Sequence, residues 1–211
     1  DVGKQVKTIL TQIKGLTVGI IAGTGINEGK RLDVKACEKI TRFAKVCDSF
    51  NISIVSLVDC EGFVPSVEEE KNGLAVAGAK MVYSLSEANV PKVAIIAGVA
   101  YGAAYVALAS KEASFDVVYA WPTAKISISE PGKIVKNLHK EEIAASENPR
   151  EAEQLLIENY LQEEATSFRA AESGYIDDVI KPAETLAKVY SALDMLQSKR
   201  ILKYPKKHGS T

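Results

Sequence analysis

Short apolar runs alternate along the chain with longer stretches in which apolar residues recur every three or four positions. The runs are rich in β-branched residues and predict buried strands at 17–22, 52–58, 92–97 and 115–119. Two helices are predicted between them, one capped by Asp33 and one that runs from Leu74 to Ala88 and ends before Pro91. Strands separated by helices favour a parallel sheet with crossover helices, so the predicted fold class is α/β.

The pattern changes towards the end of the chain. Gly102 to Ser110 predicts a short helix of small residues, whereas 125–150 is polar and predicts an irregular segment. Two amphipathic helices are predicted after it, with apolar positions at 155–168 and 186–196. We see no internal repeat or low-complexity segment, and we expect one domain over residues 1–211.

Composition narrows the possible functions. The 211 residues are 46% hydrophobic and 25% charged with a net charge of −1, which is ordinary for a globular protein and offers no general attraction to nucleic acid or to an anionic membrane. The Lys-rich tail at Lys203, Lys206 and Lys207 is expected to be solvated. The three cysteines include no CxxC pair, so we expect no disulfide framework or zinc site, a reducing cytoplasmic setting, and core positions for Cys37 and Cys47. No apolar run is long enough to span a membrane, and no signal peptide is apparent.

Several candidate motifs fail on inspection. The segment from Gly23 to Lys30 resembles a phosphate loop but lacks the required spacing of glycines and the Ser or Thr after the lysine, so we expect a turn after a strand. His139 and His208 have no metal-ligand spacing, and no metal site is predicted. Asp177 and Asp178 could be an acid–base pair, but a solvent-facing position beside a strand is the simpler interpretation.

The junction between the third strand and the short helix is the most informative segment. Small residues occupy 102–104, where the helix is expected to begin. The first turn of a helix has unpaired N–H groups and a partial positive charge, so the N–H groups of Ala103 and Ala104 could stabilise a developing oxyanion. Close packing of the helix also requires small residues and remains an alternative.

At this point the chain resembles the carboxyltransferase β subunits of biotin-dependent acyl-CoA carboxylases, such as propionyl-CoA and acetyl-CoA carboxylase, and the related decarboxylases. The motifs that carry the resemblance occur in the family's order and extend over nearly the whole chain. They are Val58-Asp-Cys-Glu-Gly-Phe-Val-Pro65, Tyr101-Gly-Ala-Ala-Tyr105, Ala120-Trp-Pro-Thr-Ala124, Gly174 to Thr185, Ser198-Lys-Arg-Ile-Leu202 and Lys206-Lys-His-Gly209.

The resemblance implies a single crotonase-like domain, a spiral of ββα units, equivalent to the C-terminal half of such a subunit. It implies that the N–H groups of Ala103 and Ala104 bind the ureido oxygen of biotin, and that Gly62, Phe63, Gly102, Tyr105 and Val106 line the biotin site. Carboxybiotin would arrive on a biotin carboxyl carrier protein loaded by a biotin carboxylase, and an acyl-CoA would be the substrate. An N-terminal half, either fused upstream or encoded separately, would hold the CoA, homo-oligomers are expected, and the isolated half is expected to be inactive.

Some positions depart from the family's pattern. Ala103 stands where the family usually has glycine, Val106 where it often has aspartate, and Glu130 where it has glycine. A non-catalytic assembly or regulatory subunit and a decarboxylase component therefore remain alternatives. A simple CoA hydratase or isomerase is a third, but the motifs at 120–124 and 206–209 and the lack of a plausible Glu pair disfavour it.

Overall fold

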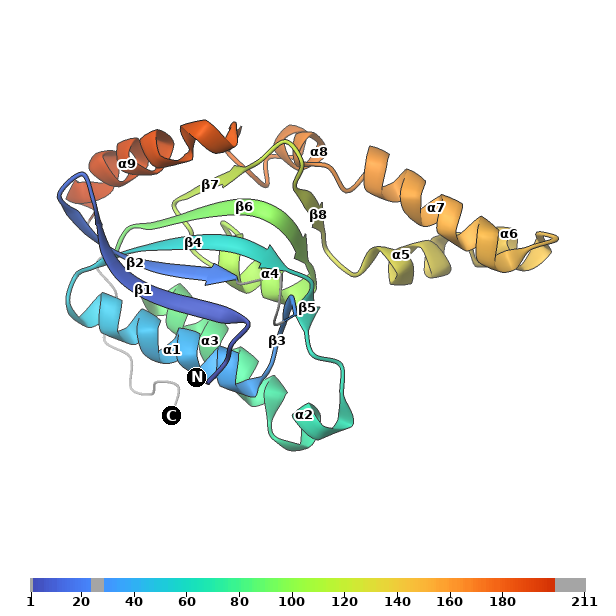
Figure 1. Ribbon diagram of the computed structural model, residues 1–211, viewed down its shortest axis with the longest axis horizontal. Helices are drawn as coiled ribbons and strands as arrows, with labels where there is room; N and C mark the ends of the chain where they lie inside the picture. The colour runs from blue at the N-terminus through green and yellow to red at the C-terminus, as the bar shows by residue number, and fades with distance from the viewer. Residues whose placement is uncertain (1, 24–28, 200–211) are drawn as a thin grey trace.

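A mostly parallel sheet forms the centre of the molecule (Figure 1). The computed structural model describes residues 2–23 and 29–199. The strand order is β1-β2-β4-β6-β7-β9, and β8 pairs with the carboxyl end of β6. All of these pairs are parallel except β1–β2, so the predicted α/β class is confirmed. The strands are β1 (Val6–Ile13), β2 (Leu16–Gly23), β4 (Ser53–Cys60), β6 (Lys92–Tyr101), β7 (Val117–Ala120), β8 (Lys125–Ser127) and β9 (Asp178–Val179).

Strand β1 was not predicted. It forms an antiparallel hairpin with β2 through the two-residue turn Lys14-Gly15, whose φ angles are 47° and 89°. Positive φ at both turn residues suits the right-handed twist of a tight hairpin. β1 is an edge strand that is buried only at its two ends, Val6 and Ile13, while Ile9 and Leu10 remain 45% and 54% exposed, so it lacks the continuous buried run that marks the central strands.

Helices α1 (Val34–Ser49), α3 (Leu74–Glu87) and α4 (Gly102–Ala109) contribute to the larger of the two apolar clusters that flank the sheet. The predicted cap is present, because Asp33 Oδ1 accepts a hydrogen bond of 2.6 Å from the Ala36 amide. The expected core positions of Cys37 and Cys47 are also confirmed, since both are fully buried. The short helix α2 (Val67–Lys71) leads into α3.

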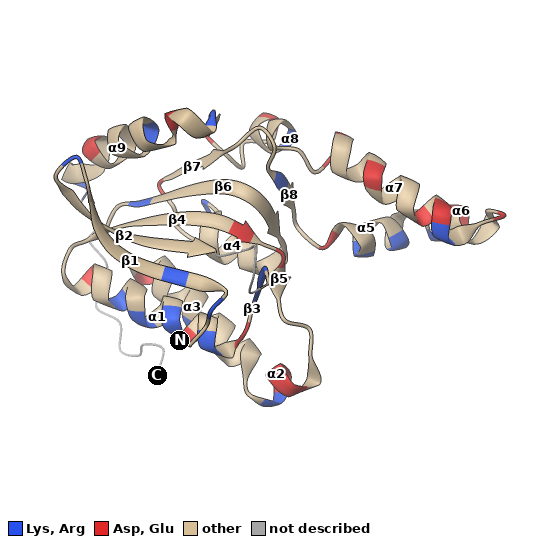
Figure 2. Ribbon diagram, in the orientation of Figure 1, with Lys and Arg blue, Asp and Glu red and all other residues tan. Residues whose placement is uncertain are grey.

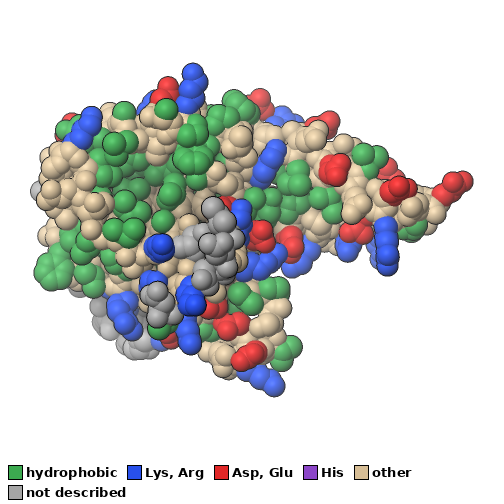
Figure 3. Space-filling view, viewed as in Figure 1, with side chains coloured by type: hydrophobic (Ala, Val, Ile, Leu, Met, Phe, Trp, Pro, Cys, Tyr) green, Lys and Arg blue, Asp and Glu red, His purple; other side chains and the backbone are tan. Residues whose placement is uncertain are grey.

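A second apolar cluster lies between the sheet and α9 (Thr185–Met195), which is flanked by the 3₁₀ turns η1 (Pro182–Glu184) and η2 (Leu196–Ser198). Trp121 Nε1 donates a 2.9 Å hydrogen bond to Thr185 Oγ1 and ties this helix to the sheet. In Figure 3, apolar side chains gather on the surface over the strands beside α9, where Ile20 and Leu57 are only partly buried. The second face of the sheet is thus less completely covered than the first.

The segment expected to be irregular instead forms β8 and the first part of a helical arm. The arm consists of α5 (Pro131–Leu138), α6 (Lys140–Ala145) and α7 (Pro149–Glu163), and Figure 1 shows it extending away from the sheet. The helix predicted over 155–168 is also interrupted, because Thr166 caps a new helix, α8 (Ser167–Glu172). α7 has no buried residue, so the helical spacing of its apolar residues does not mark a face that packs in the core.

The turn expected at Gly23 to Lys30 and the Lys-rich tail fall largely outside the described residues. The motif at 206–209 and His208 lie outside them as well. Among residues 2–23 and 29–199, none of the helices combines the length and apolar character needed to cross a bilayer.

Candidate functional site

The candidate site lies where β6 ends and α4 begins. Tyr101 is extended, with φ −119° and ψ 142°, and Gly102 then adopts φ +65° as the chain turns into the helix. This left-handed conformation favours glycine. A Cβ added at Gly102 would meet no heavy atom within 4 Å, so the turn opens onto free space. The N–H groups in the first turn of α4 therefore lie next to open space.

The small parallel sheet of β3 (Arg31–Leu32) and β5 (Gly62–Phe63) borders this turn. Gly62 has φ +125°, and a Cβ there would lie 3.9 Å from the Tyr101 carbonyl oxygen. The structure thus brings Gly62 beside the start of α4, although 40 residues separate it from Gly102. The ring of Phe63 instead packs on α3, within 3.4 Å of a Cβ built at Gly78, so this residue borders the turn through its backbone.

The residues of α4 differ in accessibility. Ala103 is exposed, whereas Ala104 is fully buried and its side chain joins the core. Tyr105 is also buried, and burial, followed by Glu112 and Tyr175, raises the pKa of its hydroxyl to about 12. The Tyr105 hydroxyl therefore stays protonated at neutral pH and can only exchange hydrogen bonds there.

Tyr105 and Val106 line a cavity of about 550 Å³ between α4, β8 and the end of α7. Val106 is 39% exposed, and Ile128 is 78% exposed at the same cavity. Ser127 Oγ and Tyr160 Oη, 3.1 Å apart, supply hydroxyl groups to its wall. The cavity is large enough for a small organic group, and its wall combines apolar and aromatic side chains with the charged residues Glu112, Glu164 and Arg169.

Charged side chains surround the small sheet (Figure 2). Arg31 Nη2 lies 3.0 Å from Glu130 Oε1, and Arg31 Nε lies 3.5 Å from Glu61 Oε2. Lys30 Nζ lies 2.9 Å from Asp59 Oδ1, which also accepts a 3.0 Å hydrogen bond from the amide of Val99. Sequence reasoning missed these charged residues, because Arg31 comes beside Glu61 through the pairing of β3 with β5 and meets Glu130 only in the folded chain. The glycine-to-glutamate departure at 130 was the one available signal.

Other candidate side chains lie away from this site. His139 pairs with Glu142 at 2.8 Å on the arm. Asp177 and Asp178 pair with Lys111 and Lys188 beside β9, in agreement with their interpretation as surface carboxylates. The described part of the chain holds no group of three or more His, Cys, Asp or Glu side chains arranged for a metal ion.

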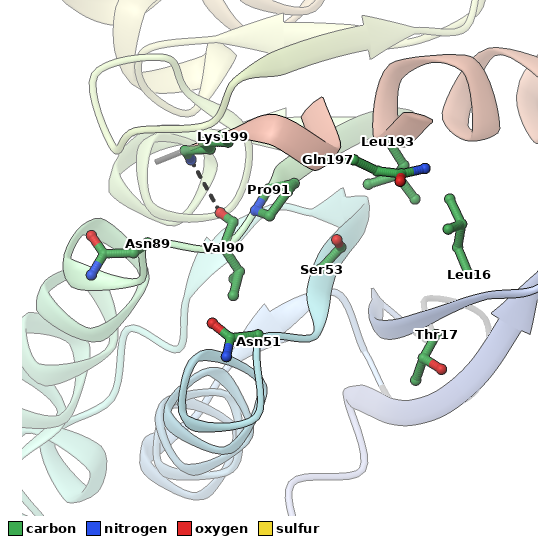
Figure 4. A pocket seen from close by; sticks show the side chains of 10 residues that line it. All are labelled: Leu16, Thr17, Asn51, Ser53, Asn89, Val90, Pro91, Leu193, Gln197 and Lys199. Atoms are coloured by element: carbon green, nitrogen blue, oxygen red, sulfur yellow. Dashed lines mark hydrogen bonds between the residues drawn. The ribbon is translucent and has the colours of Figure 1, made fainter. Parts of the chain in front are cut away.

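A larger cavity of about 670 Å³ lies near the amino ends of β4 and β6 (Figure 4). Lys199 Nζ donates to the carbonyl of Val90 at 3.1 Å and to Asp116 at 2.8 Å, so its charge is engaged within the fold. This cavity lies at the amino ends of the strands, whereas the glycine turn lies at the carboxyl end of β6. In open parallel sheets, ligands bind at the carboxyl ends of the strands. We therefore place the candidate site at the glycine turn despite the smaller cavity beside it.

The chemistry available at the turn comes from the backbone. Two first-turn N–H groups and the helix dipole favour an oxygen that carries negative charge, while Gly102 and Ala103 leave room for a planar group to approach. The site can therefore stabilise an oxyanion without a nucleophilic side chain.

Comparisons with known proteins point to one family. The model of the carboxyl transferase domain matches residues 1–211. The carboxyltransferase subunit of propionyl-CoA carboxylase from Haloferax mediterranei is 42% identical over 210 residues, which cover 100% of this chain and 41% of the relative. The α subunit of methylmalonyl-CoA decarboxylase from Propionigenium modestum is 38% identical over 207 residues, 98% of this chain and 40% of the relative.

A solved structure of the transcarboxylase 12S hexamer, with methylmalonyl-CoA and methylmalonic acid bound, superposes with a TM-score of 0.91 at 39% identity. The match covers 97% of this chain and 39% of the other, and it confirms the expected crotonase-like fold. The chain thus spans about two-fifths of the length of the relatives it matches. These matches, together with the motifs and the fold, show that the chain belongs to the carboxyl transferase domain family.

Proposed function

We propose that the chain is the C-terminal, biotin-side half of a cytoplasmic acyl-CoA carboxyltransferase. The observation that carries this proposal is the glycine turn, where Gly102 opens onto free space next to Gly62 at the start of a helix. This arrangement supports binding of the biotin ureido oxygen by the N–H groups of Ala103 and Ala104.

The residues present fit a biotin ring. Gly62 and Gly102 carry no side chain towards the turn, so the planar ureido ring can approach the backbone donors. Tyr105 and Val106 extend the site as an apolar wall into the adjoining cavity. Bound carboxybiotin would supply the carboxyl group, and negative charge would develop on its ureido oxygen as that group leaves the ring nitrogen; the role of this chain would be to hold that oxygen. Such a role requires no catalytic histidine and no metal ligand, and none lies at the turn among the described residues.

The proposed substrate and partners are inferred from family membership. A relative is named for propionyl-CoA, and a solved neighbour contains methylmalonyl-CoA, so a short acyl-CoA is the proposed substrate. The transfer requires biotin and the thioester within near-attack distance. We find one oxyanion site among the described residues, so an N-terminal half is proposed to hold the CoA. A biotin carboxyl carrier protein, a biotin carboxylase and further copies of this chain are the other proposed partners.

A decarboxylase component remains the second candidate, because a relative of similar identity carries that name. A non-catalytic assembly subunit is favoured by one observation, the charged group formed by Arg31, Glu61 and Glu130 beside the turn. Both alternatives retain the fold and differ in what happens to the carboxyl group.

The test uses free biotin first and turnover second. We expect biotin added to the isolated chain to shift the amide resonances of 102–105, and binding only elsewhere on the surface would contradict the site. We next expect no carboxyl transfer from carboxybiotin to a panel of short acyl-CoAs by the isolated chain, and transfer after the candidate N-terminal half is added. Robust turnover by the isolated chain would overturn the divided site, whereas inactivity of the complete assembly would favour the assembly subunit.

A further inference from the structure

Arg31 occupies an unusual position between the glycine turn and the helical arm. Its guanidinium contacts Glu130, the residue before the arm, at 3.0 Å, and Glu61, the residue before Gly62, at 3.5 Å. A Cβ built on Gly62 would lie 4.0 Å from Arg31 Nη1. One cation therefore joins two segments that are 69 residues apart in the sequence.

The backbone fixes where this cation can be. Arg31 pairs with Gly62 in the β3–β5 ladder, and the amide of Glu61 donates a 2.8 Å hydrogen bond to the carbonyl of Lys30. The side chain of Arg31 is 27% exposed, and those of Glu61 and Glu130 are each 40% exposed. A half-buried guanidinium held by two carboxylates is less screened by solvent than a pair on an open surface.

Glu130 directly precedes the arm. It occupies the N-cap position of α5 but makes no capping hydrogen bond with its side chain, which reaches Arg31 and, at 3.6 Å, Lys133. The following residue, Pro131, is buried and fixes the direction in which the helix leaves. The other end of the arm is attached to β8, where Lys125 Nζ donates to the carbonyl of Leu161 at 2.7 Å.

We infer that Arg31 is a positioning residue of this site, and that its contacts with Glu61 and Glu130 hold the turn at Gly62 and the first end of the helical arm in one relative arrangement. The inference rests on the proposed function for its catalytic meaning, but the arrangement itself can be measured without turnover. Removing the cation would leave two carboxylates near each other without their shared partner, and both segments could then move apart.

The first measurement is hydrogen exchange on the full 211-residue chain. In Glu130→Gln, which keeps the shape of the side chain but removes its charge, we expect amides at 131–138 and 61–63 to exchange about fivefold faster, in line with a partly exposed ion pair. Arg31→Lys should cause a smaller increase, because it retains the charge but loses the forked geometry.

A matched control is available within the arm. Lys136 and Glu153 form an ion pair of 3.2 Å between α5 and α7. Lys136→Gln should accelerate exchange within the arm alone, and residues 61–63 should keep their wild-type rates. Equal acceleration at 61–63 in both variants would overturn the inference.

Rescue and ligand binding separate positioning from general destabilisation. The doubly reversed variant Arg31→Glu with Glu130→Arg should regain slow exchange at 131–138, although Glu61 then repels the new glutamate and keeps the rescue partial.

The affinity for free biotin should fall about fivefold in Glu130→Gln. Salt at 0.5 M shortens the screening length to about 4 Å, so it should weaken biotin binding by the wild type more than by the variant. Unchanged exchange in Glu130→Gln sinks the inference even if biotin binds. Altered exchange without any biotin binding supports the arrangement and counts against the proposed function instead.

Discussion

Two glycines near the candidate site are needed for different physical reasons. Gly102 is required by its backbone, since its φ of +65° is unfavourable for residues with a Cβ, while the space around it is free. Gly98 is required by its neighbour, because a Cβ there would lie 2.3 Å from Asp59 Oδ1. The first glycine leaves room for a ligand, and the second leaves room for a carboxylate of the protein itself.

Gly98→Ala should therefore destabilise the fold. The added methyl group forces the Asp59 carboxylate away from Lys30 and from the amide of Val99, and such overpacking costs about 1–3 kcal/mol. Denaturant unfolding measures the change. Gly132→Ala in helix α5 is the matched control, because a Cβ there would meet only the side chain of Ile157 at an ordinary contact distance of 3.6 Å. A loss of stability in the control as large as that in Gly98→Ala would contradict this explanation.

Ala104→Pro tests the proposed oxyanion donor. It removes one backbone N–H group in the first turn of α4, and in a competent assembly the turnover rate should fall about a hundredfold, or about 3 kcal/mol. Ala104→Gly retains the N–H group and should keep most of the rate. Since Ala104 is fully buried, circular dichroism must first show that the proline variant folds. A folded variant with wild-type turnover excludes this role.

At the level of elements, a buried lysine joins the end of α3 to the neighbouring loop. Lys92 at the start of β6 is fully buried, and its Nζ donates to the Leu85 carbonyl at 2.6 Å and to the hydroxyl of Ser114. A cation near the last carbonyl groups of a helix is favoured by the helix dipole. The position looks like an ordinary strand start in the sequence, so only the structure reveals this bond.

Lys92→Met should lower the free energy of unfolding by about 1–3 kcal/mol, because it leaves the buried Leu85 carbonyl without this donor. Thermal and urea unfolding would measure the loss. Lys71→Met, at an exposed position in α2, is the comparison and should change stability by less than about 0.5 kcal/mol. The absence of any difference between the two variants would mean that the bond adds no net stability.

The sequence predicted those elements whose apolar period reflects burial. The central strands and α1 face the core, and their patterns were sufficient to place them. The edge strand β1 escaped because Ile9 remains 45% exposed, and α5 and α6 escaped because 125–150 is largely polar, whereas α7 was predicted as a helix although its Leu155 remains 60% exposed. Their stability depends on neighbours, including the antiparallel ladder for β1 and the Lys136–Glu153 ion pair for the arm.

The candidate site was predictable only in part, where its residues form a local motif in the sequence. The small residues at 102–104 and the resemblance around 58–65 carried a local signal, and the structure places Gly62 beside the turn. Arg31 carried none, because its significance depends on strand pairing with residue 62 and on the path of the chain to residue 130. Contacts of this range follow from the whole topology rather than from spacing along the chain.

At the scale of the whole molecule, buried thiols make stability sensitive to alkali. Burial, chiefly, raises the pKa of Cys37 to about 12 and those of Cys47 and Cys60 to about 11, from an ordinary value of 9.0. Between these values and 9 the unfolded chain loses protons that the folded chain keeps, so unfolding becomes easier as pH rises. Below pH 9 the contribution is complete.

We therefore expect the free energy of unfolding to be flat with respect to these groups up to about pH 9 and to fall towards pH 11. The slope approaches about 1.4 kcal/mol per pH unit for each thiol. Urea unfolding across this range measures it. Cys47→Ala should reduce the slope in proportion to the thiol removed, after correction for its loss of stability at pH 7. An identical slope in the variant would show that other groups control the alkaline transition.

Because the arm is long, a small rotation at its base would displace its tip by a larger amount. Helix α7 has 15 residues and is about 22 Å long, so a rotation of about 10° at its base moves its tip by about 4 Å. A rotation about the contact between Arg31 and Glu130 would therefore be magnified at the far end of the arm, so the position of that end would report on the arrangement of the glycine turn.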